Sequence, residues 1–152
     1  TGVQTCALPI CNGTRVAVIA EVEVDMKSGK VRGKKFTVAH DCGIVINPQL
    51  LTQTIEGNVS QALSRAIHEE VKFDNRNVTS TDWNTYPIFD IKDVPETIDI
   101  TLLDHPEQPP FGAGEATVRP LSAALANAIF DATGVRLRQL PLTAEKIKAG
   151  WA

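Results

Sequence analysis

Cysteine is scarce in this chain, and its three residues match none of the spacings used by disulfide scaffolds or zinc ribbons. The count is odd and no CxxC pair occurs, which argues against both kinds of structure. The three histidines, His40, His68 and His105, are not spaced as metal ligands on one helix either. The sequence therefore predicts no metal site built from this chain's own side chains.

A strong charge of one sign and a long hydrophobic run are absent as well. The 15 basic and 18 acidic residues give a net charge of -3, and the pI is near 5.6, so no surface for nucleic acid or for an anionic membrane is expected. No apolar run approaches the ~20 residues that a membrane-spanning helix needs. The 152 residues suffice for one soluble domain with a sizeable core.

Charged side chains are also missing from the beginning of the chain, where the first is Arg15. Residues 1–11, TGVQTCALPIC, hold two of the three cysteines, lack an initiator methionine, and have no basic flank of the kind found in signal peptides. We expect them to be a non-native segment left by sequence assembly. Residues 12–152 would then be the C-terminal portion of a longer polypeptide. An ordinary irregular N-terminal segment is the alternative.

Several segments show the alternating pattern of strands. Residues 15–25 alternate, meet a turn at Lys27-Ser28-Gly29-Lys30, and are followed by a returning run over 31–41, which together predict a β-hairpin. A second pair of short strands is expected within 71–79, and another strand over 98–104.

Apolar residues at three- and four-residue spacing predict two long helices, over 48–68 and 118–133. A last short helix is expected over 143–149. The simplest architecture for this order of elements is α+β, with the two long helices packed on one face of a mixed sheet. Gly57 lies in the middle of the first helix and costs about 1 kcal/mol relative to alanine, so a packed element or a ligand is expected to approach the backbone there.

The segment FGAGEATVRP at 111–120 is the best candidate for chemistry. Its turn of Gly112, Ala113 and Gly114 delivers the carboxylate of Glu115 to the start of a helix. Glycines let a backbone approach a ligand closely, and unpaired amides at a helix N-terminus favour a nearby carboxylate. Glu115 is therefore a candidate general base. The alternative is an ordinary glycine turn with a solvated glutamate.

Three stretches give the chain a family resemblance: DCGIVINP at 41–48, TIEGNVSQALSRAIHEEV at 54–71, and GAGE followed by LSAALANAIFDATGVRLRQLPLT to residue 143. Their order and spacing resemble the C-terminal end of the molybdopterin-binding subunit of the xanthine dehydrogenase and aldehyde oxidase family, in particular the isoquinoline 1-oxidoreductase β-subunit type. The resemblance implies a fragment of a larger molybdopterin-binding domain, and so part of a molybdenum hydroxylase. Such an enzyme oxidises an N-heteroaromatic or aldehyde substrate with water as the oxygen source.

The resemblance also implies roles for single residues. Glu115 matches the glutamate of GxGE, which accepts the proton of the attacking oxygen beside the molybdenum. The turn 112–114 would touch the cofactor. On the first long helix, Gly57 and Gln61 match cofactor-facing positions, and Thr54 occupies the place where the family usually has a glutamine.

The implied cofactor is molybdopterin, with the cytosine dinucleotide form as one option. The implied partners are the upstream part of the same subunit, an iron–sulfur subunit with [2Fe-2S] clusters, and a small-molecule substrate. Because this chain has no cysteine set for such clusters, the clusters are expected on a partner. A soluble protein of bacterial type, cytoplasmic or periplasmic, would fit.

Two other classes of function stay open. A cysteine hydrolase could be built on Cys42 with His68 or His105 as its base. However, neighbours on a strand point to opposite faces, so His40, Asp41 and Cys42 cannot all converge, and Asp41 and Cys42 are interpreted as structural. The second alternative is a structural module that completes a larger subunit and has no activity of its own.

Overall fold

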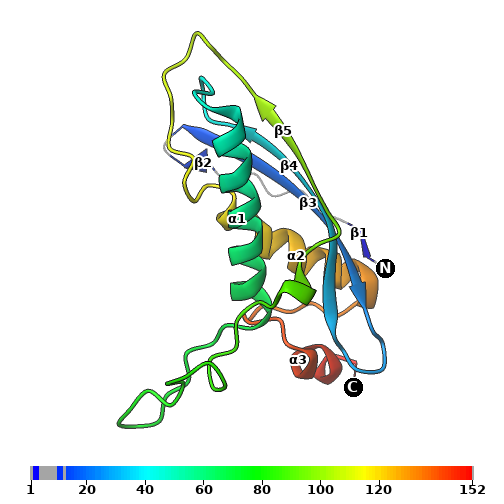
Figure 1. Ribbon diagram of the computed structural model, residues 1–152. Coiled ribbons are helices and arrows are strands. Elements are labelled where there is room, and N and C mark those ends of the chain that lie inside the picture. The colour runs from blue at the N-terminus through cyan, green and yellow to red at the C-terminus, as the bar shows by residue number, and fades with distance from the viewer. Residues whose placement is uncertain (1, 4–9, 12, 152) are drawn as a thin grey trace.

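The computed structural model describes residues 2–3, 10–11 and 13–151 as one α+β unit (Figure 1). The elements in chain order are β1 (Gly2–Val3), β2 (Ile10–Cys11), β3 (Thr14–Val24), β4 (Val31–Asp41), α1 (Pro48–Ile67), the short 3-10 helix η1 (Ile91–Asp93), β5 (Thr97–Leu103), α2 (Val118–Thr133) and α3 (Ala144–Ala149).

The sheet is mixed, as the sequence predicts. β3 and β4 form the expected antiparallel hairpin, and β5 then pairs parallel to β4. The two-residue strands β1 and β2 lie along the other edge of β3. Alternate residues of β3 are buried, among them Val16, Val18 and Val22, so one face of the sheet points into the core.

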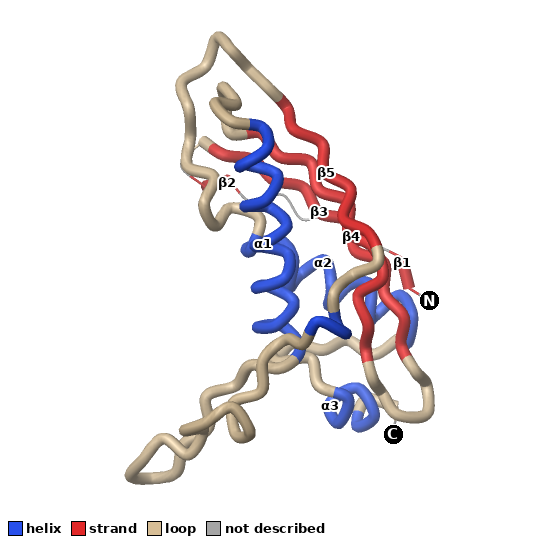
Figure 2. Tube along the Cα trace, viewed as in Figure 1, coloured by secondary structure: helices blue, strands red, loops and turns tan. Residues whose placement is uncertain are grey.

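Both long helices cover that one face, which confirms the predicted architecture (Figure 2). α2 packs directly on β3, and α1 packs against α2 while reaching β4 and β5. The largest buried side chains of the core come from the sheet, from α1 and from α2: Phe36, Ile55, Leu63, Leu121, Leu125 and Ile129. The small side chains of Ala124 and Ala128, both fully buried, let α2 lie close to the sheet.

Local signals set the helix ends where the sequence places them. The side chain of Asn47 accepts a hydrogen bond from the amide of Leu50 at 3.0 Å, and Pro48 takes the first helical position. α2 ends at Gly134, whose φ of 74° is left-handed. The hydroxyl of Thr143 caps α3. No helix among the described residues is long and apolar enough to cross a bilayer.

The expected pair of short strands within 71–79 is wrong. The structure has only one isolated bridge there, between Phe73 and Val78. Residues 69–90 instead form an irregular arm that projects away from the sheet and helices (Figure 1). Two very short strands are not stable alone, and the exposed side chains of Phe73 and Val78 show that the arm finds no sheet to pack on.

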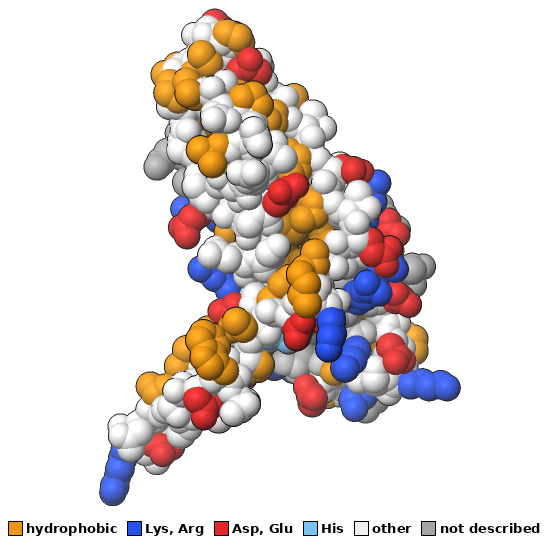
Figure 3. Space-filling model, in the orientation of Figure 1, with side chains coloured by type: hydrophobic (Ala, Val, Ile, Leu, Met, Phe, Trp, Pro, Cys, Tyr) orange, Lys and Arg blue, Asp and Glu red, His pale blue; other side chains and the backbone are white. Residues whose placement is uncertain are grey.

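Hydrophobic side chains gather along this arm (Figure 3). Its exposed apolar residues are Val71, Phe73, Val78, Trp83 and Ile88, of which Phe73 and Trp83 are about three-quarters exposed (75% and 76%). At the base of the arm, the Tyr86 hydroxyl donates a hydrogen bond to Glu69 at 2.8 Å. The arm is thus fixed at its base by a hydrogen bond, and its apolar side chains are exposed along its length.

Most of residues 1–11, which we expect to be non-native, lie outside the described residues, since 1 and 4–9 are not among them. The two described pieces of that segment, Gly2–Val3 and Ile10–Cys11, pair with β3. The division at residue 12 stays a prediction.

Candidate functional site

The GAGE turn at 112–115 connects an extended loop to the first turn of α2. Upstream, the amide of Phe111 donates to the carbonyl of Cys42 at 2.8 Å, and the hydroxyl of Thr14 donates to the carbonyl of Gly112 at 2.6 Å. Downstream, the next residues are buried as α2 begins. The turn is therefore held on both sides, and it bulges outward between these anchors.

Glu115 is exposed at this turn. Its carbonyl accepts a hydrogen bond from the amide of Val118 at 3.2 Å. Within the described part of the chain, no hydrogen bond or ion pair involves its carboxylate. The N-cap of α2, Thr117, makes no side-chain capping bond. The amide of Val118 is already used by the Glu115 carbonyl, and Pro120 has no amide N–H, so the start of this helix offers few donors to an anionic group.

The glycines of the chain separate into two groups. Seven of the ten have a reason within the chain: a left-handed φ, as in Gly134, or atoms that an added Cβ would meet, as in Gly33. For the other three, no φ is left-handed and a Cβ would meet no atom within 4 Å. These three are Gly57, Gly112 and Gly114. All three are positions where the family resemblance implies contact with a cofactor.

The sequence predicts that either a packed element or a ligand approaches the backbone at Gly57. A packed element of this chain is excluded among the described residues, because the space beside Gly57 is open. Approach by a ligand stays a prediction.

A cavity of about 310 Å³ lies between the N-terminal half of α1 and the GAGE turn. Thr54, Ala113 and Gly114 all line it, and most of the remaining walls are apolar. The hydroxyl of Thr54 donates to the carbonyl of Leu50 at 2.9 Å, so it is already used inside the helix.

Gln61 is not part of that cavity. It lies two turns further along α1, where it lines a separate hollow of about 280 Å³. Thr54, Gly57 and Gln61 nevertheless follow each other at helical spacing along α1, so they share one side of it.

Cys42 does not have the surroundings of a nucleophile. Burial raises the pKa of its thiol, and the nearby charges of Asp41 and Asp104 raise it further, so the reactive thiolate is disfavoured. The Nε2 atom of His105 lies 3.7 Å from Oδ2 of Asp41. No described contact joins His105 to Cys42. Asp41 also accepts a hydrogen bond from the amide of Gly43 at 3.1 Å. These contacts agree with the structural interpretation of Asp41 and Cys42, and they disfavour a hydrolase.

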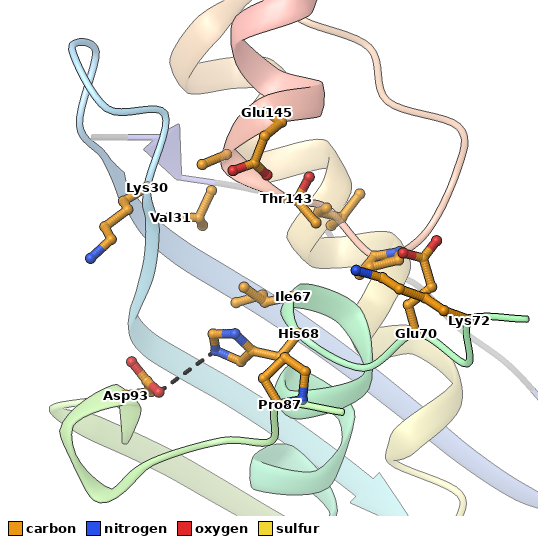
Figure 4. Close-up of a pocket in the computed structure, with 13 residues that line it drawn as sticks. Lys30, Val31, Ile67, His68, Glu70, Lys72, Pro87, Asp93, Thr143 and Glu145 are labelled. Carbon is orange, nitrogen blue, oxygen red and sulfur yellow. Dashed lines mark ion pairs between the residues drawn. The ribbon is translucent and has the colours of Figure 1, made fainter. Parts of the chain in front are cut away.

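A third cavity, of about 370 Å³, lies at the other end of α1 (Figure 4). His68 at the helix end faces Asp93 at 3.6 Å, with Lys30 and Glu145 on other walls of the cavity. Since α1 has 20 residues and a helix rises 1.5 Å per residue, about 30 Å of helix separates this cavity from the start of α1. The cavity is therefore distinct from the GAGE site.

Sequence reasoning missed the residues that hold the GAGE loop: Gly13, Thr14, Gly43 and Phe111. Gly13 and Gly43 carried a usable signal, since each stands beside the end of a predicted hairpin strand. Thr14 carried none, because its partner is 98 residues away.

The family assignment follows from comparison with known proteins. A family model described as the molybdopterin cofactor-binding domain matches residues 9–95, more than half of the chain. The chain belongs to this family. It is homologous to molybdenum-dependent oxidoreductases of the xanthine dehydrogenase and aldehyde oxidase family, and it corresponds to part of their molybdopterin-binding subunit.

Individual relatives support this assignment. One of the subunits of nicotinate dehydrogenase from Pseudomonas putida is 43% identical over 133 residues, which are 88% of this chain and 11% of that protein. Aldehyde oxidoreductase of Megalodesulfovibrio gigas is 33% identical over 133 residues, covering 85% of this chain and 14% of that protein. The crystal structure of quinoline 2-oxidoreductase from Pseudomonas putida 86 superposes with a TM-score of 0.83 at 30% identity, over 90% of this chain and 18% of that one. The chain thus spans less than a fifth of the length of each of these relatives.

Proposed function

We propose that the chain is the C-terminal portion of the molybdenum-binding subunit of a hydroxylase, with Glu115 as the general base. Its substrate class would be N-heteroaromatic compounds or aldehydes, with water as the oxygen source. Two relatives are named for nicotinate and quinoline, which are N-heteroaromatic, and a third for aldehydes. The stretches that resemble the isoquinoline 1-oxidoreductase type favour the heteroaromatic class.

The single observation that carries the proposal is the open space at Gly57, Gly112 and Gly114. A glycine in mid-helix or in a turn without left-handed φ costs stability and gains nothing inside this chain. The cost is explained if a group from outside comes close to the backbone at these positions. Of the three glycines, only Gly114 lines the cavity between α1 and the GAGE turn, and Glu115 is not among its lining residues either. A cofactor that reaches from this cavity over the turn and along the exposed side of α1 at Gly57 would meet the requirement at all three positions, and in that arrangement the residues present fit molybdopterin.

The residues that would hold the cofactor come from two elements. The turn would contribute Gly112, Ala113 and Gly114. Helix α1 would contribute Thr54, Gly57 and Gln61, with Gln61 offering both a hydrogen-bond donor and an acceptor.

The cofactor, when bound, supplies the two-electron oxidation of the substrate. This chain's part is to move a proton. The carboxylate of Glu115 is exposed and makes no described contact that would compete for it, so one of its oxygens can accept the proton of the water-derived nucleophile as the new C–O bond forms.

The rest of the enzyme has to come from other polypeptide segments. The upstream part of the subunit would complete the cofactor site, since this chain offers only one wall of it. Electrons would leave through an iron–sulfur subunit, because the three cysteines of this chain do not form a cluster-binding set.

Glu115→Gln in the complete cofactor-loaded complex tests the proposal. The substitution keeps the shape but removes the basic oxygen, so molybdenum content should be retained while turnover falls by about 10²–10⁴. Glu56→Gln, an exposed position on α1, is the matched control and should leave turnover near the parent value. Near-normal turnover of Glu115→Gln with full molybdenum loading would refute the assignment.

A further inference from the structure

Thr14 is a buried polar residue with one hydrogen bond to the loop that carries Glu115. It is the first residue of β3 and is fully buried (0% exposed). Its hydroxyl donates to the carbonyl of Gly112 at 2.6 Å across 98 residues of sequence. The next core-facing positions of the strand, Val16 and Val18, are valines. Valine at position 14 would have the same shape, so the hydroxyl is what distinguishes threonine there.

Phe111, which precedes Gly112 in the sequence, is held by residues just before the start of β3 and just after the end of β4. Its amide donates to Cys42 at 2.8 Å, and its ring lies against Gly13 and Gly43. A Cβ at Gly13 would come within 2.6 Å of the ring, and one at Gly43 within 3.2 Å. Both glycines have left-handed φ angles, 93° and 75°, so other residues would be strained there as well.

The loop is equally fixed after Glu115. Ala116 and Thr117 are buried, at 4% and 0% exposure, and α2 follows at once. Only residues 113–115 lie between the two anchors. In so short a segment, a shift of the Gly112 carbonyl is passed on to the carboxylate of Glu115, because three residues leave few backbone torsions to absorb it.

We propose that Thr14 is a positioning residue: its hydrogen bond to Gly112 sets the place of the Glu115 carboxylate. The inference rests on the proposed function for its effect on catalysis, but not for its effect on the loop. It assigns to the beginning of β3, far from the GAGE motif in sequence, a part in the geometry of the site.

The test uses two variants of the complete subunit. Thr14→Val removes the hydroxyl and keeps the shape, and Thr14→Ser keeps the hydroxyl. Thr133→Val is the control at the far end of α2, because it removes a hydroxyl that donates to the carbonyl of Ile129 and accepts from the amide of Val135. Two quantities are measured: amide hydrogen exchange over residues 111–117, without and with cofactor, and the steady-state constants kcat and KM of the loaded complex.

Thr14→Val should speed exchange over 111–117 in both states and lower kcat about ten- to hundredfold with KM nearly unchanged, as expected for a misplaced catalytic group. Thr14→Ser should restore both quantities, and Thr133→Val should change neither. Unchanged exchange in Thr14→Val refutes the structural tie, whatever Glu115 does. Faster exchange with unchanged kcat, in an enzyme that Glu115→Gln inactivates, refutes the positioning role. If Glu115→Gln stays active, the proposed function fails and with it the catalytic role of Thr14, while the exchange data still decide the tie.

Discussion

His40 of β4 lies directly opposite Val16 of β3 in the antiparallel register, on the core face of the sheet, and both side chains are at most 1% exposed. Within the described residues, neither ring nitrogen of His40 has a hydrogen-bond partner. Burying a neutral imidazole without partners already costs free energy, and burying the charged form would cost much more.

This environment makes folding stability depend on pH. Burial lowers the pKa of His40, and the nearby charge of Asp41 opposes this only in part. The unfolded chain therefore binds the extra proton more readily than the folded one. Stability should be full above the ordinary histidine value of about 6.5 and decline as the pH falls through the lower pKa of the folded state.

Urea unfolding of the 152-residue chain between about pH 5 and 7.5 measures this, because the carboxyl groups titrate mostly below that range. His40→Gln should flatten the dependence, since glutamine does not titrate. A variant whose stability declines as steeply as that of the parent would show that other groups are responsible. The exposed carboxyl groups with lowered pKa values act at more acidic pH: Asp25, Asp74, Asp82, Glu96 and Glu145.

Gly57→Ala should have opposite effects on the chain and on the complex. In the 152-residue chain the new methyl group meets no atom within 4 Å, so the better helix propensity of alanine should raise the free energy of unfolding by about 0.5–1 kcal/mol. In the complete subunit the same methyl group should lower molybdenum content, because it would fill the space assigned to the cofactor.

Gly134→Ala is the control for this pair of measurements. Its open surroundings are similar, but its φ of 74° disfavours alanine, so the substitution should destabilise the chain. Metal analysis by mass spectrometry and denaturant unfolding give the two readouts. Full molybdenum loading of Gly57→Ala would contradict a cofactor at this face of α1.

The isolated 152-residue chain should bind no molybdopterin and show no oxidoreductase activity. It presents the open cavity beside Thr54 and Gly114 and the bare arm over 69–90, and in the complete subunit we expect other segments to cover both. Molybdenum analysis and sedimentation of the purified chain test this. Stoichiometric molybdenum on the isolated chain would show that its one wall is sufficient.

Deleting residues 1–11 should leave the melting temperature of the chain nearly unchanged if they are non-native. The described part of this segment adds the two-residue strands β1 and β2 to the edge of β3, and β1 also lies against α2 near Ala128. So short a pairing contributes little by itself. A fall of many degrees in thermal unfolding would show that the segment is native structure.

The parts of the fold that depend on local pattern could be predicted from the sequence. The bounds of α1 and α2 follow from apolar spacing together with Asn47, Pro48 and Gly134, which act within one turn of the helix ends. The arm could not be predicted in this way. The alternation around Phe73 and Val78 is that of a strand, but a strand forms only where another lies beside it, and local sequence does not show that.

The site divides in the same manner. Glu115 and its glycines are visible because they are contiguous in the sequence. The contacts that hold Phe111 and Gly112 are not visible, because they depend on Thr14 and Gly43, which are distant in sequence and lie beside the loop only in the folded structure.

The parallel alignment of β5 with β4 has a kinetic consequence. The hairpin of β3 and β4 closes through a tight turn, an event that takes about 1–10 μs in small systems. β5 starts only at Thr97, after α1 and the whole arm have passed, so its pairing with β4 must wait for a long loop to close. The loop that carries Glu115 follows β5, and its anchors are Thr14 and Cys42 at the ends of the hairpin, so we expect its ordering to require the closure of a long loop as well. We therefore expect the loop of Glu115 to become ordered late in folding, after the hairpin of β3 and β4 has formed.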